Sequence, residues 1–276
     1  MTASSPPKVL SIAGVDPSGG AGVLADVKAM SALGAYACAV IAALTAQNTR
    51  AVTGIWPVPP DFVAQQIDTL FADVAIDSVK VGMLGEAPVI ERVAERLAHW
   101  RPRYMVIDPV MVAKSGDALL APSAVEALRS CLLPLATVIT PNLPEAAVLL
   151  AEPVVTRLED MPLVAARLWR LIGAREGSYV LLKGGHLPGE DCTDVLFDGV
   201  RVMELPAARI ATRNTHGTGC TLSAALAALL PQSPDVPTAV HRAKAYLGAA
   251  LARADELGVG AGHGPVHHFH AWWPMS

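Results

Sequence analysis

Short apolar segments with strand character alternate with segments of helical spacing along almost the whole chain of 276 residues. Residues 8–15, 104–108 and 179–183 are mostly continuous apolar runs, which are typical of strands buried on both faces. Helical spacing follows, for example at 23–33, and Gly34 suits the position just after a helix. This alternation predicts an α/β fold of three layers, with a mostly parallel central sheet covered by helices on both faces.

The remaining elements follow from the same patterns and from turn signals. We expect further strands at 35–45, 78–83 and 137–140, a β-type segment at 209–212, and a hairpin at 195–205 that turns at Asp198-Gly199. We expect further helices at 61–71, 86–100, 122–132, 144–150 and 161–172, and two around Ala225 and Ala245. No internal repeat or linker interrupts the pattern, so residues 1–276 are predicted to form one domain, with residues 1–7 flexible.

Composition argues against several classes of protein. Charged residues make up only 17% of the chain and the net charge is −4, so nothing favours binding to nucleic acid or to an acidic membrane surface. No apolar run approaches the ~20 residues of a membrane-spanning helix, and the first residues lack the apolar core of a signal peptide. The four cysteines are scattered without a C-x-x-C pair, which indicates neither a zinc site nor a disulfide framework. We therefore expect a soluble cytoplasmic protein.

Residues 214–221 (Asn-Thr-His-Gly-Thr-Gly-Cys-Thr) combine the features of a phosphate site with a reactive side chain, just before an Ala- and Leu-rich helical segment. Gly217 and Gly219 would let backbone N–H groups converge at the helix entrance, where the helix dipole attracts negative charge. Cys220 lies in the same first turn, a setting that lowers the pKa of a thiol. An anion hole beside a potential base suits phosphoryl transfer onto a hydroxyl. The alternative is that the glycines only make a tight turn and Cys220 is a small core residue.

A second glycine-rich segment, Asp16-Pro-Ser-Gly-Gly-Ala-Gly22, follows the first expected strand. It does not match the dinucleotide pattern G-x-G-x-x-G, and the chain contains no G-x-x-x-x-G-K-[ST] loop. A nucleotide would therefore bind through a loop of a different kind. These glycines could equally serve only the packing of the strand against the helix.

Three oxygen-bearing side chains follow the central strands and suit Mg²⁺, which takes few carboxylates and keeps several waters: Asp108, Asn142 and Glu145. Asn142 and Glu145 lie three residues apart at the start of an expected helix. The same spacing is that of a capping box, in which Asn142 caps the helix and Glu145 is its partner. Both interpretations remain open from the residues alone.

Two further polar residues end strands at the edge where ligands bind in such sheets. Lys183, followed by two glycines, would present an ammonium and bare backbone, although a lysine at a strand end is most often only solvated. Gln47 carries a donor and an acceptor side by side, which suits the edge of an aminopyrimidine, although it could be an ordinary loop residue. The histidines at 263, 267, 268 and 270 match no metal-binding spacing, and their neighbours Trp272 and Trp273 indicate packing over an apolar patch.

Taken together, these segments resemble the ribokinase-like superfamily and, within it, the hydroxymethylpyrimidine/phosphomethylpyrimidine kinases of thiamine biosynthesis. Any one motif is weakly specific, but the ordered set is highly specific and covers nearly the whole chain. The resemblance is carried by residues 13–22 (Ala-Gly-Val-Asp-Pro-Ser-Gly-Gly-Ala-Gly), 45–48 (Thr-Ala-Gln-Asn), 80–83 (Lys-Val-Gly-Met), 108–111 (Asp-Pro-Val-Met), 140–145 (Thr-Pro-Asn-Leu-Pro-Glu), 183–186 (Lys-Gly-Gly-His), 214–220 and the ending 264–273.

The resemblance implies roles around the transferred group and the substrate. Cys220 would take the proton of the substrate hydroxymethyl group, while the backbone of residues 217–220 would hold charge on the transferring phosphoryl. Gln47 would hydrogen-bond the pyrimidine, and Asp16 would lie near the substrate. Apolar or close backbone contacts would come from Gly14, Met83 and Val110.

The resemblance also implies a nucleotide side of the site. Lys183 would contact the phosphates of ATP, with Asn142 and Thr215 beside the nucleotide. Asp108 and Glu145, together with Asn142, would organise Mg²⁺ directly or through water. Residues 113–117 resemble a flap whose closure would exclude water from the site.

The implied activity is transfer from ATP to 4-amino-5-hydroxymethyl-2-methylpyrimidine (HMP) and then to HMP-phosphate, in a protein that we expect to be a homodimer. The second step needs a cation beside the substrate phosphate, for which Lys114 is the candidate. Many relatives in the superfamily, including pyridoxal and sugar kinases, have Asp where this chain has Cys220, so the cysteine and Gln47 favour the pyrimidine. A pyridoxine/pyridoxal kinase is the alternative enzyme, and a catalytically silent ligand-binding regulator is the alternative outside enzymes.

Overall fold

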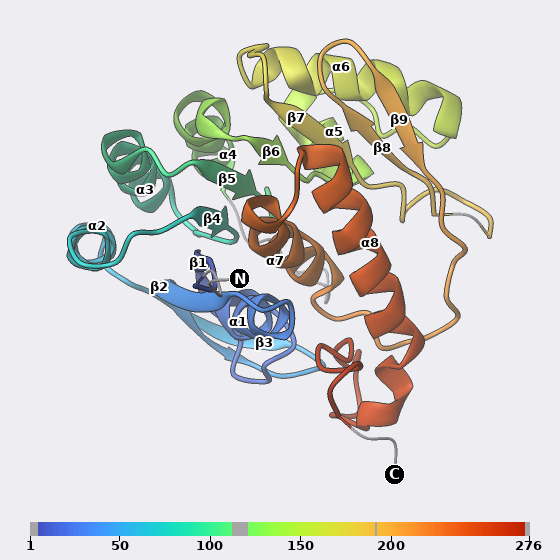
Figure 1. Ribbon diagram of the computed structural model, residues 1–276, viewed down its shortest axis with the longest axis horizontal. Helices are drawn as coiled ribbons and strands as arrows, with labels where there is room; N and C mark the ends of the chain where they lie inside the picture. The colour runs from blue at the N-terminus through green and yellow to red at the C-terminus, as the bar shows by residue number, and fades with distance from the viewer. Residues whose placement is uncertain (1–4, 112–120, 191, 274–276) are drawn as a thin grey trace.

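The computed structural model describes residues 5–111, 121–190 and 192–273. The predicted flap at 113–117 and the candidate Lys114 lie outside the described residues. Within them, nine strands join in a single sheet, in the order β3-β2-β1-β4-β5-β6-β7-β8-β9 (Figure 1). The strands are β1 (Lys8–Val15), β2 (Tyr36–Gln47), β3 (Val52–Pro57), β4 (Ser78–Val81), β5 (Tyr104–Ile107), β6 (Val138–Ile139), β7 (Tyr179–Leu182), β8 (Asp194–Phe197) and β9 (Val202–Leu205).

The central strands are parallel and the edges are antiparallel. Parallel pairing joins β2, β1, β4, β5, β6 and β7, whereas β3, β8 and β9 pair antiparallel with their neighbours. The carboxyl ends of the parallel strands therefore meet at the same edge of the sheet, where ligands bind in folds of this kind.

Helices cover both faces of the sheet, as Figure 1 shows. One face carries α1 (Gly22–Ala32), α7 (Thr218–Leu229) and α8 (Val236–Ala252); the other carries α2 (Pro60–Phe71), α3 (Ala87–Trp100), α4 (Pro122–Ala127), α5 (Leu143–Leu150) and α6 (Met161–Leu171). Short helical turns lie at Leu128–Leu132, Leu133–Leu135, Leu158–Asp160, Leu230–Gln232 and Ala254–Leu257. None of the described helices is long and apolar enough to cross a membrane.

Alternation along the strands explains why one sheet separates two apolar cores. In β1, Leu10 and Ile12 belong to the core under α2 to α6, whereas Val9 belongs to the core under α1, α7 and α8. Residues buried on both faces give the continuous apolar runs seen in the sequence. The predicted three-layer α/β/α fold is thereby confirmed, while the assignment of residues 1–276 to one domain stays a prediction.

Three local features of the structure differ from what the sequence led us to expect. Residues 209–212 form no strand, although they lead into α7 as expected. The edge strand β3 was not expected, because it contains Gly54, ends at Pro57 and shows no alternation of buried and exposed residues. The helix expected at 122–132 is α4 followed by a π-helical segment, Leu128–Leu132.

Gly22→Ala should destabilise the fold more than Gly34→Ala. Both glycines have positive φ, +58° and +79°, so a side chain at either position costs about 1–2 kcal/mol of backbone strain. A Cβ at Gly22 would also lie 2.3 Å from the Gly14 carbonyl oxygen, whereas at Gly34 the nearest heavy atom would be 4.0 Å away. Urea unfolding should show a loss of about 3 kcal/mol or more for Gly22→Ala and about 1 kcal/mol for Gly34→Ala. Equal losses would contradict the close approach of the two backbones.

Candidate active site

A cavity of about 740 Å³ opens at the carboxyl edge of the parallel strands. The ends of β1, β2, β4 and β7 and the start of α7 line it, which is the arrangement that the alternation of strands and helices predicted. The structure brings together in this cavity all the site residues predicted from the sequence: Gly14, Asp16, Gln47, Met83, Asp108, Val110, Asn142, Glu145, Lys183, Thr215, Gly217, Gly219 and Cys220.

The start of α7 presents bare backbone to the cavity. Gly217, with φ of +73°, precedes the helix, and no side chain caps the first turn. A Cβ at Gly217 would lie 1.8 Å from the Gly20 carbonyl oxygen, so only glycine fits where these two loops meet. The first N–H groups of a helix have no partner within it and are therefore open to an anion, apart from that of Thr218, which donates to the Thr215 carbonyl oxygen at 3.4 Å. The geometry of the predicted anion hole is therefore present.

Cys220 lies in the first turn of α7, as predicted, but its electrostatic setting is the opposite of the prediction. Burial raises the pKa of the Cys220 thiol to about 11, and the charges of Asp26 and Asp108 add to the rise. The ammonium of Lys80 and a hydrogen bond from the Gly22 backbone favour the thiolate, but they do not outweigh burial. The expectation that the turn lowers the thiol pKa is wrong, because the protein packed around the sulfur raises it, although Cys220 keeps part of its surface open to the cavity. Cys220 is a neutral thiol in the free protein near pH 7.

Asp108 and Lys183 form an ion pair in the wall of the cavity. Lys183 Nζ lies 3.0 Å from Asp108 Oδ1, which also accepts a hydrogen bond from Thr140 Oγ1 at 2.9 Å. Ser223 on α7 donates to the second carboxylate oxygen at 3.2 Å. Burial alone would raise the pKa of Asp108, but the ammonium groups and hydrogen bonds around it lower it overall. Lys183 is therefore held by a charge, and the alternative that it is only solvated is wrong.

The capping-box interpretation of Asn142 and Glu145 is confirmed. The Asn142 side-chain oxygen accepts a hydrogen bond from the Glu145 N–H at 2.8 Å, and Glu145 Oε2 accepts one from the Asn142 N–H at 2.8 Å. Glu145 Oε2 also lies 4.0 Å from Lys183 Nζ. Burial raises the pKa of Glu145 to about 7, although the Lys183 charge opposes the rise. Glu145 thus combines a structural contact with a carboxyl group that faces the cavity.

The donor groups present fit a metal ion that arrives with phosphates better than a resident one. Among residues 5–111, 121–190 and 192–273, no group of three or more His, Cys, Asp and Glu side chains could hold a metal ion. Asp108 and Glu145 still offer two carboxylates around one point, now bridged by Lys183. Mg²⁺ bound to a nucleotide needs only one or two protein carboxylates, because phosphates and water complete its shell.

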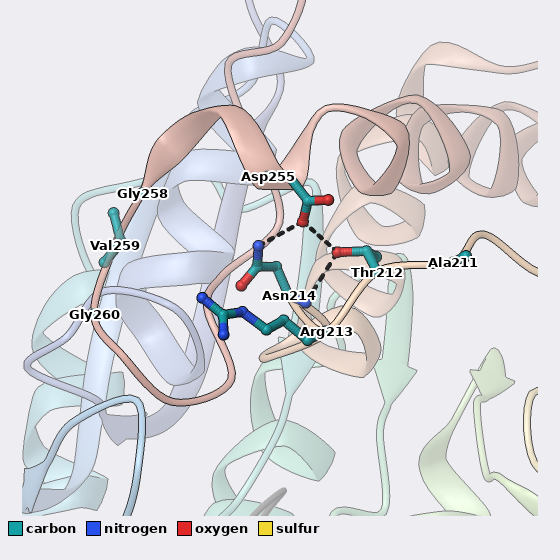
Figure 2. Close-up of a pocket in the computed structure, with 8 residues that line it drawn as sticks. All are labelled: Ala211, Thr212, Arg213, Asn214, Asp255, Gly258, Val259 and Gly260. Atoms are coloured by element: carbon teal, nitrogen blue, oxygen red, sulfur yellow. Dashed lines mark hydrogen bonds between the residues drawn. The ribbon is translucent and has the colours of Figure 1, made fainter.

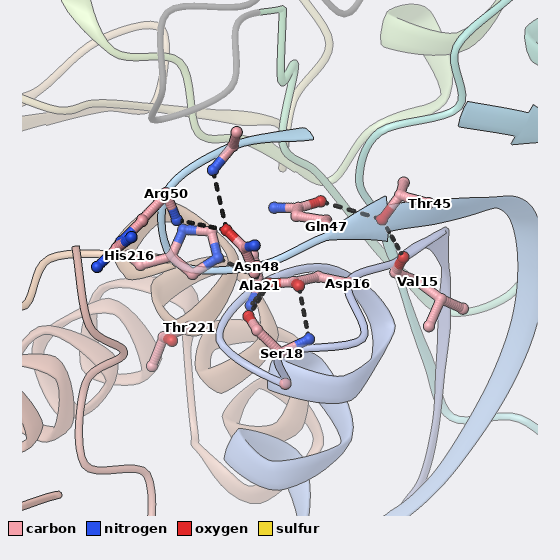
Figure 3. Close-up of polar contacts among 12 residues, drawn as sticks. Val15, Asp16, Ser18, Ala21, Thr45, Gln47, Asn48, Arg50, His216 and Thr221 are labelled. Atoms are coloured by element: carbon pink, nitrogen blue, oxygen red, sulfur yellow. Dashed lines mark hydrogen bonds and ion pairs between the residues drawn. The ribbon is translucent and has the colours of Figure 1, made fainter. Parts of the chain in front are cut away.

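Asp16 anchors the loop after β1 to the loop before α7. Its Oδ2 lies 2.7 Å from His216 Nε2, and its carboxylate also accepts hydrogen bonds from Ser18 and from the Ala21 N–H, as Figure 3 shows. Burial would raise the pKa of Asp16, but these hydrogen bonds lower it overall. Asp16 therefore lines the cavity as a charged anchor with both oxygens already engaged.

The predicted pyrimidine side of the cavity is shaped by backbone contacts. The Gly14 N–H donates to the Met83 carbonyl oxygen at 3.0 Å, and a Cβ at Gly14 would lie 2.7 Å from Met83 Cε. Gln47 ends β2, with its Oε1 3.2 Å from Thr45 Oγ1, which in turn lies 2.8 Å from the Val15 carbonyl oxygen (Figure 3). These contacts hold an amide and a thioether on the same side of the cavity.

A second cavity of about 640 Å³ lies beside the loop that enters α7, lined by residues 211–214, Asp255 and residues 258–260 (Figure 2). Thr212 Oγ1 and Asn214 Nδ2 both donate to Asp255 Oδ1, at 2.5 Å and 2.6 Å. These bonds fix the loop that carries Thr215 and His216 into the main cavity.

The histidines near the C-terminal end pack against aromatic rings and α7 and do not converge as the ligands of a metal ion would. His267 and Phe269 contact the ring of Trp273, and His268 Nε2 lies 3.1 Å from Thr221 Oγ1 on α7. Burial lowers the pKa of His268 to about 3, which keeps its ring neutral. The expectation that this segment packs over an apolar patch agrees with the structure for Phe269 and the buried rings of His267 and His268, whereas Trp272 and Trp273 stay largely exposed.

Comparison with known proteins identifies the family to which the chain belongs. Residues 16–267 match the family described as phosphomethylpyrimidine kinase. The chain belongs to the phosphomethylpyrimidine kinase family. It is 56% identical over 264 residues to the hydroxymethylpyrimidine/phosphomethylpyrimidine kinase of Escherichia coli (strain K12), covering 96% of this chain and 98% of that protein.

Solved structures of related kinases share the fold. An ADP complex of Bacillus subtilis pyridoxal kinase superposes with a TM-score of 0.87 at 35% identity, covering 97% of this chain and 99% of that one. A phosphomethylpyrimidine kinase from Clostridium difficile 630 superposes with a TM-score of 0.77 at 37% identity, covering 89% of this chain and 99% of that one. The family and the ribokinase-like fold predicted from the sequence are confirmed, while the roles of single site residues stay predictions.

Sequence reasoning about this family member missed several residues of the cavity. His216 and Lys80 stand inside motifs that carried the resemblance, yet neither was given a role. Ser223 and Thr140, which bond Asp108 from behind the cavity wall, were also given no role. Ser223 lies in an Ala-rich helix without a spacing signal, and Thr140 begins the motif at 140–145. The pairing of His216 with Asp16 joins residues 200 positions apart, so no local pattern could reveal it.

Glu145→Gln should stabilise the protein at alkaline pH. The folded state raises the pKa of Glu145 from 4.5 to about 7, so its stabilising contribution is complete below pH 4.5 and is lost as the pH rises through 7. Gln cannot ionise and can still serve in the capping box. Urea unfolding should show the variant on the order of 2 kcal/mol more stable than the natural protein at pH 8, with little difference at pH 4.5.

Glu176→Gln is the control for this experiment, because Glu176 is exposed. Its stability should track that of the natural protein at both pH values. If Glu145→Gln differed from the natural protein by the same free energy of unfolding at pH 4.5 and pH 8, the prediction that folding raises the pKa of Glu145 would be wrong.

Proposed function

We propose that the chain is an ATP-dependent kinase that phosphorylates HMP to HMP-phosphate and then HMP-phosphate to HMP-diphosphate, in thiamine biosynthesis. The observation that carries this is the convergence of the bare α7 entrance, Cys220 and the Asp108–Lys183 pair on one cavity of about 740 Å³. The curated relative from Escherichia coli, 56% identical, is named a kinase of both acceptors.

On the acceptor side, Gln47 hydrogen-bonds the aminopyrimidine while Met83 and Val110 pack against its ring. This pose directs the hydroxymethyl group towards Cys220. With a pKa of about 11, the thiol is rarely ionised near neutral pH, so it cannot act as a strong early base. Phosphoryl transfer proceeds through a loose transition state in which bonding to the hydroxyl oxygen is weak, so positioning and charge stabilisation carry most of the rate. The small fraction of Cys220 that has released its thiol proton to water accepts the hydroxyl proton as transfer completes.

On the donor side, Lys183 and the backbone N–H groups of residues 217–220 stabilise charge on the transferring phosphoryl. Asn142 and Thr215 lie beside the nucleotide. Asp108 and Glu145 would hold Mg²⁺ directly or through water, and the ion would neutralise phosphate charge. Once phosphates and a cation are present, Lys183 can exchange a carboxylate partner for a phosphate partner, because both are anions.

A pyridoxine/pyridoxal kinase is the second candidate. Solved pyridoxal kinases from Bacillus subtilis and Staphylococcus aureus superpose on this chain with TM-scores of 0.87 and 0.86. The second phosphorylation of HMP-phosphate would separate the two activities, because it needs a cation near the substrate phosphate. Lys114 remains the candidate for that cation.

We also propose a cytoplasmic homodimer. The edge strand β3 exposes Trp56, 74% of whose surface is accessible, directly opposite the exposed Leu44 on β2. An unpaired strand edge beside exposed apolar side chains suits a second copy of the same chain.

A coupled assay of ADP release should show a preference for HMP over pyridoxal, with little release when no acceptor is present. We expect kcat/KM for HMP to exceed that for pyridoxal by at least about tenfold, since Gln47 pairs with an aminopyrimidine edge that pyridoxal lacks. Product analysis should find both the mono- and the diphosphate. A larger kcat/KM for pyridoxal would favour the second candidate, and ADP release that no acceptor stimulates would remove both.

Cys220→Ala should slow transfer to HMP far more than transfer to HMP-phosphate. The alcohol must lose its proton, whereas a phosphate monoester is largely ionised near neutral pH. We expect kcat to fall by about 10²-fold or more for HMP and by less than about tenfold for HMP-phosphate, with HMP affinity by calorimetry nearly unchanged. Cys131→Ala, at an exposed position, is the control. Near-full turnover of HMP by Cys220→Ala would take Cys220 out of the base role.

A further inference from the structure

A buried ion pair lies beside the cavity and outside the proposed roles. Lys80 Nζ on β4 lies 2.8 Å from Asp26 Oδ2 on α1, and both side chains are 0% exposed. Ser11 on β1, the direct neighbour of Lys80 in the sheet, donates to the same Asp26 oxygen at 2.6 Å. The flanking β4 residues Val79 and Val81 belong to the core under α2 to α6, so alternation places Lys80 on the face covered by α1 and α7.

The fold gains little from this pair. Taking two charges out of water costs several kcal/mol per ion, and apolar replacements of a buried pair are often neutral or stabilising. The pair is also incompletely satisfied, because within the described part of the chain Asp26 Oδ1 has no hydrogen-bond partner. The surrounding face is apolar and rich in Ala and Leu from α7, so uncharged residues would suit it. A role in the site explains the pair better than a role in stability.

The ammonium end of the pair reaches the site. Lys80 lines the same cavity as Cys220, and a Cβ at Gly82 would lie 2.6 Å from Lys80 Nζ, so bare backbone lies beside the charge at the strand end. Lys80 stays protonated, because the carboxylates around it outweigh burial and raise its pKa. The charged groups that act on the Cys220 sulfur are Lys80, which favours the thiolate, and Asp26 and Asp108, which oppose it; Lys183 interacts with the sulfur as well.

We propose that Lys80, held by Asp26, is a positioning residue whose positive charge stabilises the thiolate of Cys220. The proposal rests on the proposed function, in which the thiolate takes the hydroxyl proton. In that step the O–H bond breaks and the proton goes to sulfur. The oxygen lone pair forms the new O–P bond, and ADP leaves with the electron pair of the old one. Lys80 transfers no atom; it lowers the energy of the anionic form that must precede the step.

Lys80→Met/Asp26→Asn tests the net effect of the pair by removing both charges while keeping side-chain volume. Because Lys80 favours the thiolate more strongly than Asp26 opposes it, the loss of both charges should raise the thiol pKa. Iodoacetamide should alkylate Cys220 at least about tenfold more slowly at pH 9 than in the natural protein, which corresponds to about one unit of thiol pKa. Mass spectrometry of the Cys220 peptide measures this rate in the whole protein without interference from the other cysteines. We also expect kcat for HMP to fall about tenfold or more while KM stays within about twofold.

Ser11→Ala is the matched control, because it removes a hydrogen bond from the same cluster and keeps both charges. Its alkylation rate and kcat should stay close to those of the natural protein. If Lys80→Met/Asp26→Asn does not fold, Lys80→Met/Asp26→Leu/Ser11→Ala removes the same charges in an apolar form, and the same readouts apply.

The outcomes separate the two proposals. An unchanged alkylation rate in the folded charge-free variant, or equal slowing in Ser11→Ala, would overturn the role of Lys80 whatever the protein phosphorylates. Slower alkylation in the charge-free variant, in a protein that does not phosphorylate HMP, would support the charge effect on Cys220 and reject the proposed function.

Discussion

The contact between the loop after β1 and the entrance of α7 holds the site together. A Cβ at Gly217 would lie 1.8 Å from the Gly20 carbonyl oxygen, and His216 Nε2 lies 2.7 Å from Asp16 Oδ2. The two loops meet because β1 lies inside the sheet, beside β4, and α7 packs on β4, β5 and α1. With the loop fixed in this way, the first turn of α7 borders the cavity without a side-chain cap on its N–H groups. A side chain at Gly20 or Gly217 would push the two loops apart and move the entrance of α7 away from the loop after β1.

Charge is concentrated in the site and stability comes from elsewhere. The Asp108–Lys183 and Asp26–Lys80 pairs both lie at the carboxyl edge, and buried pairs of this kind seldom add to stability. The two apolar cores on either side of the sheet stabilise the fold instead. Glu145 is another group of the site that does not stabilise the fold. Its raised pKa means that its ionised form is unfavourable in the folded protein without a bound cation. Buried charges that destabilise the free protein would strengthen the binding of phosphates and of a metal ion at this site.

Features that depend on local sequence patterns could be predicted from the sequence, whereas features that depend on contacts between distant residues could not. Long apolar runs and helical spacing located the parallel strands and the large helices, and the three-residue spacing of Asn142 and Glu145 correctly indicated a capping box. The exposed edge strand β3 lacks such a pattern and was missed. The sign of the Cys220 pKa shift was wrong, because a helix entrance favours a thiolate only if burial does not outweigh it. The Lys80–Asp26 pair joins residues 54 positions apart, so the fold had to be known first.

A thiol that stays neutral at rest suits a kinase with two acceptors. The donor, the first acceptor's product and the carboxylates of the site all carry negative charge, so an ionised base in the α7 entrance would repel the phosphates that this entrance attracts. An aspartate at position 220 would be ionised unless burial raised its pKa strongly, whereas burial leaves Cys220 uncharged. The second acceptor is already an anion and needs no proton removed. A base that is neutral in most molecules, and whose ionised form the Lys80 charge stabilises, thus serves the alcohol without excluding the phosphate.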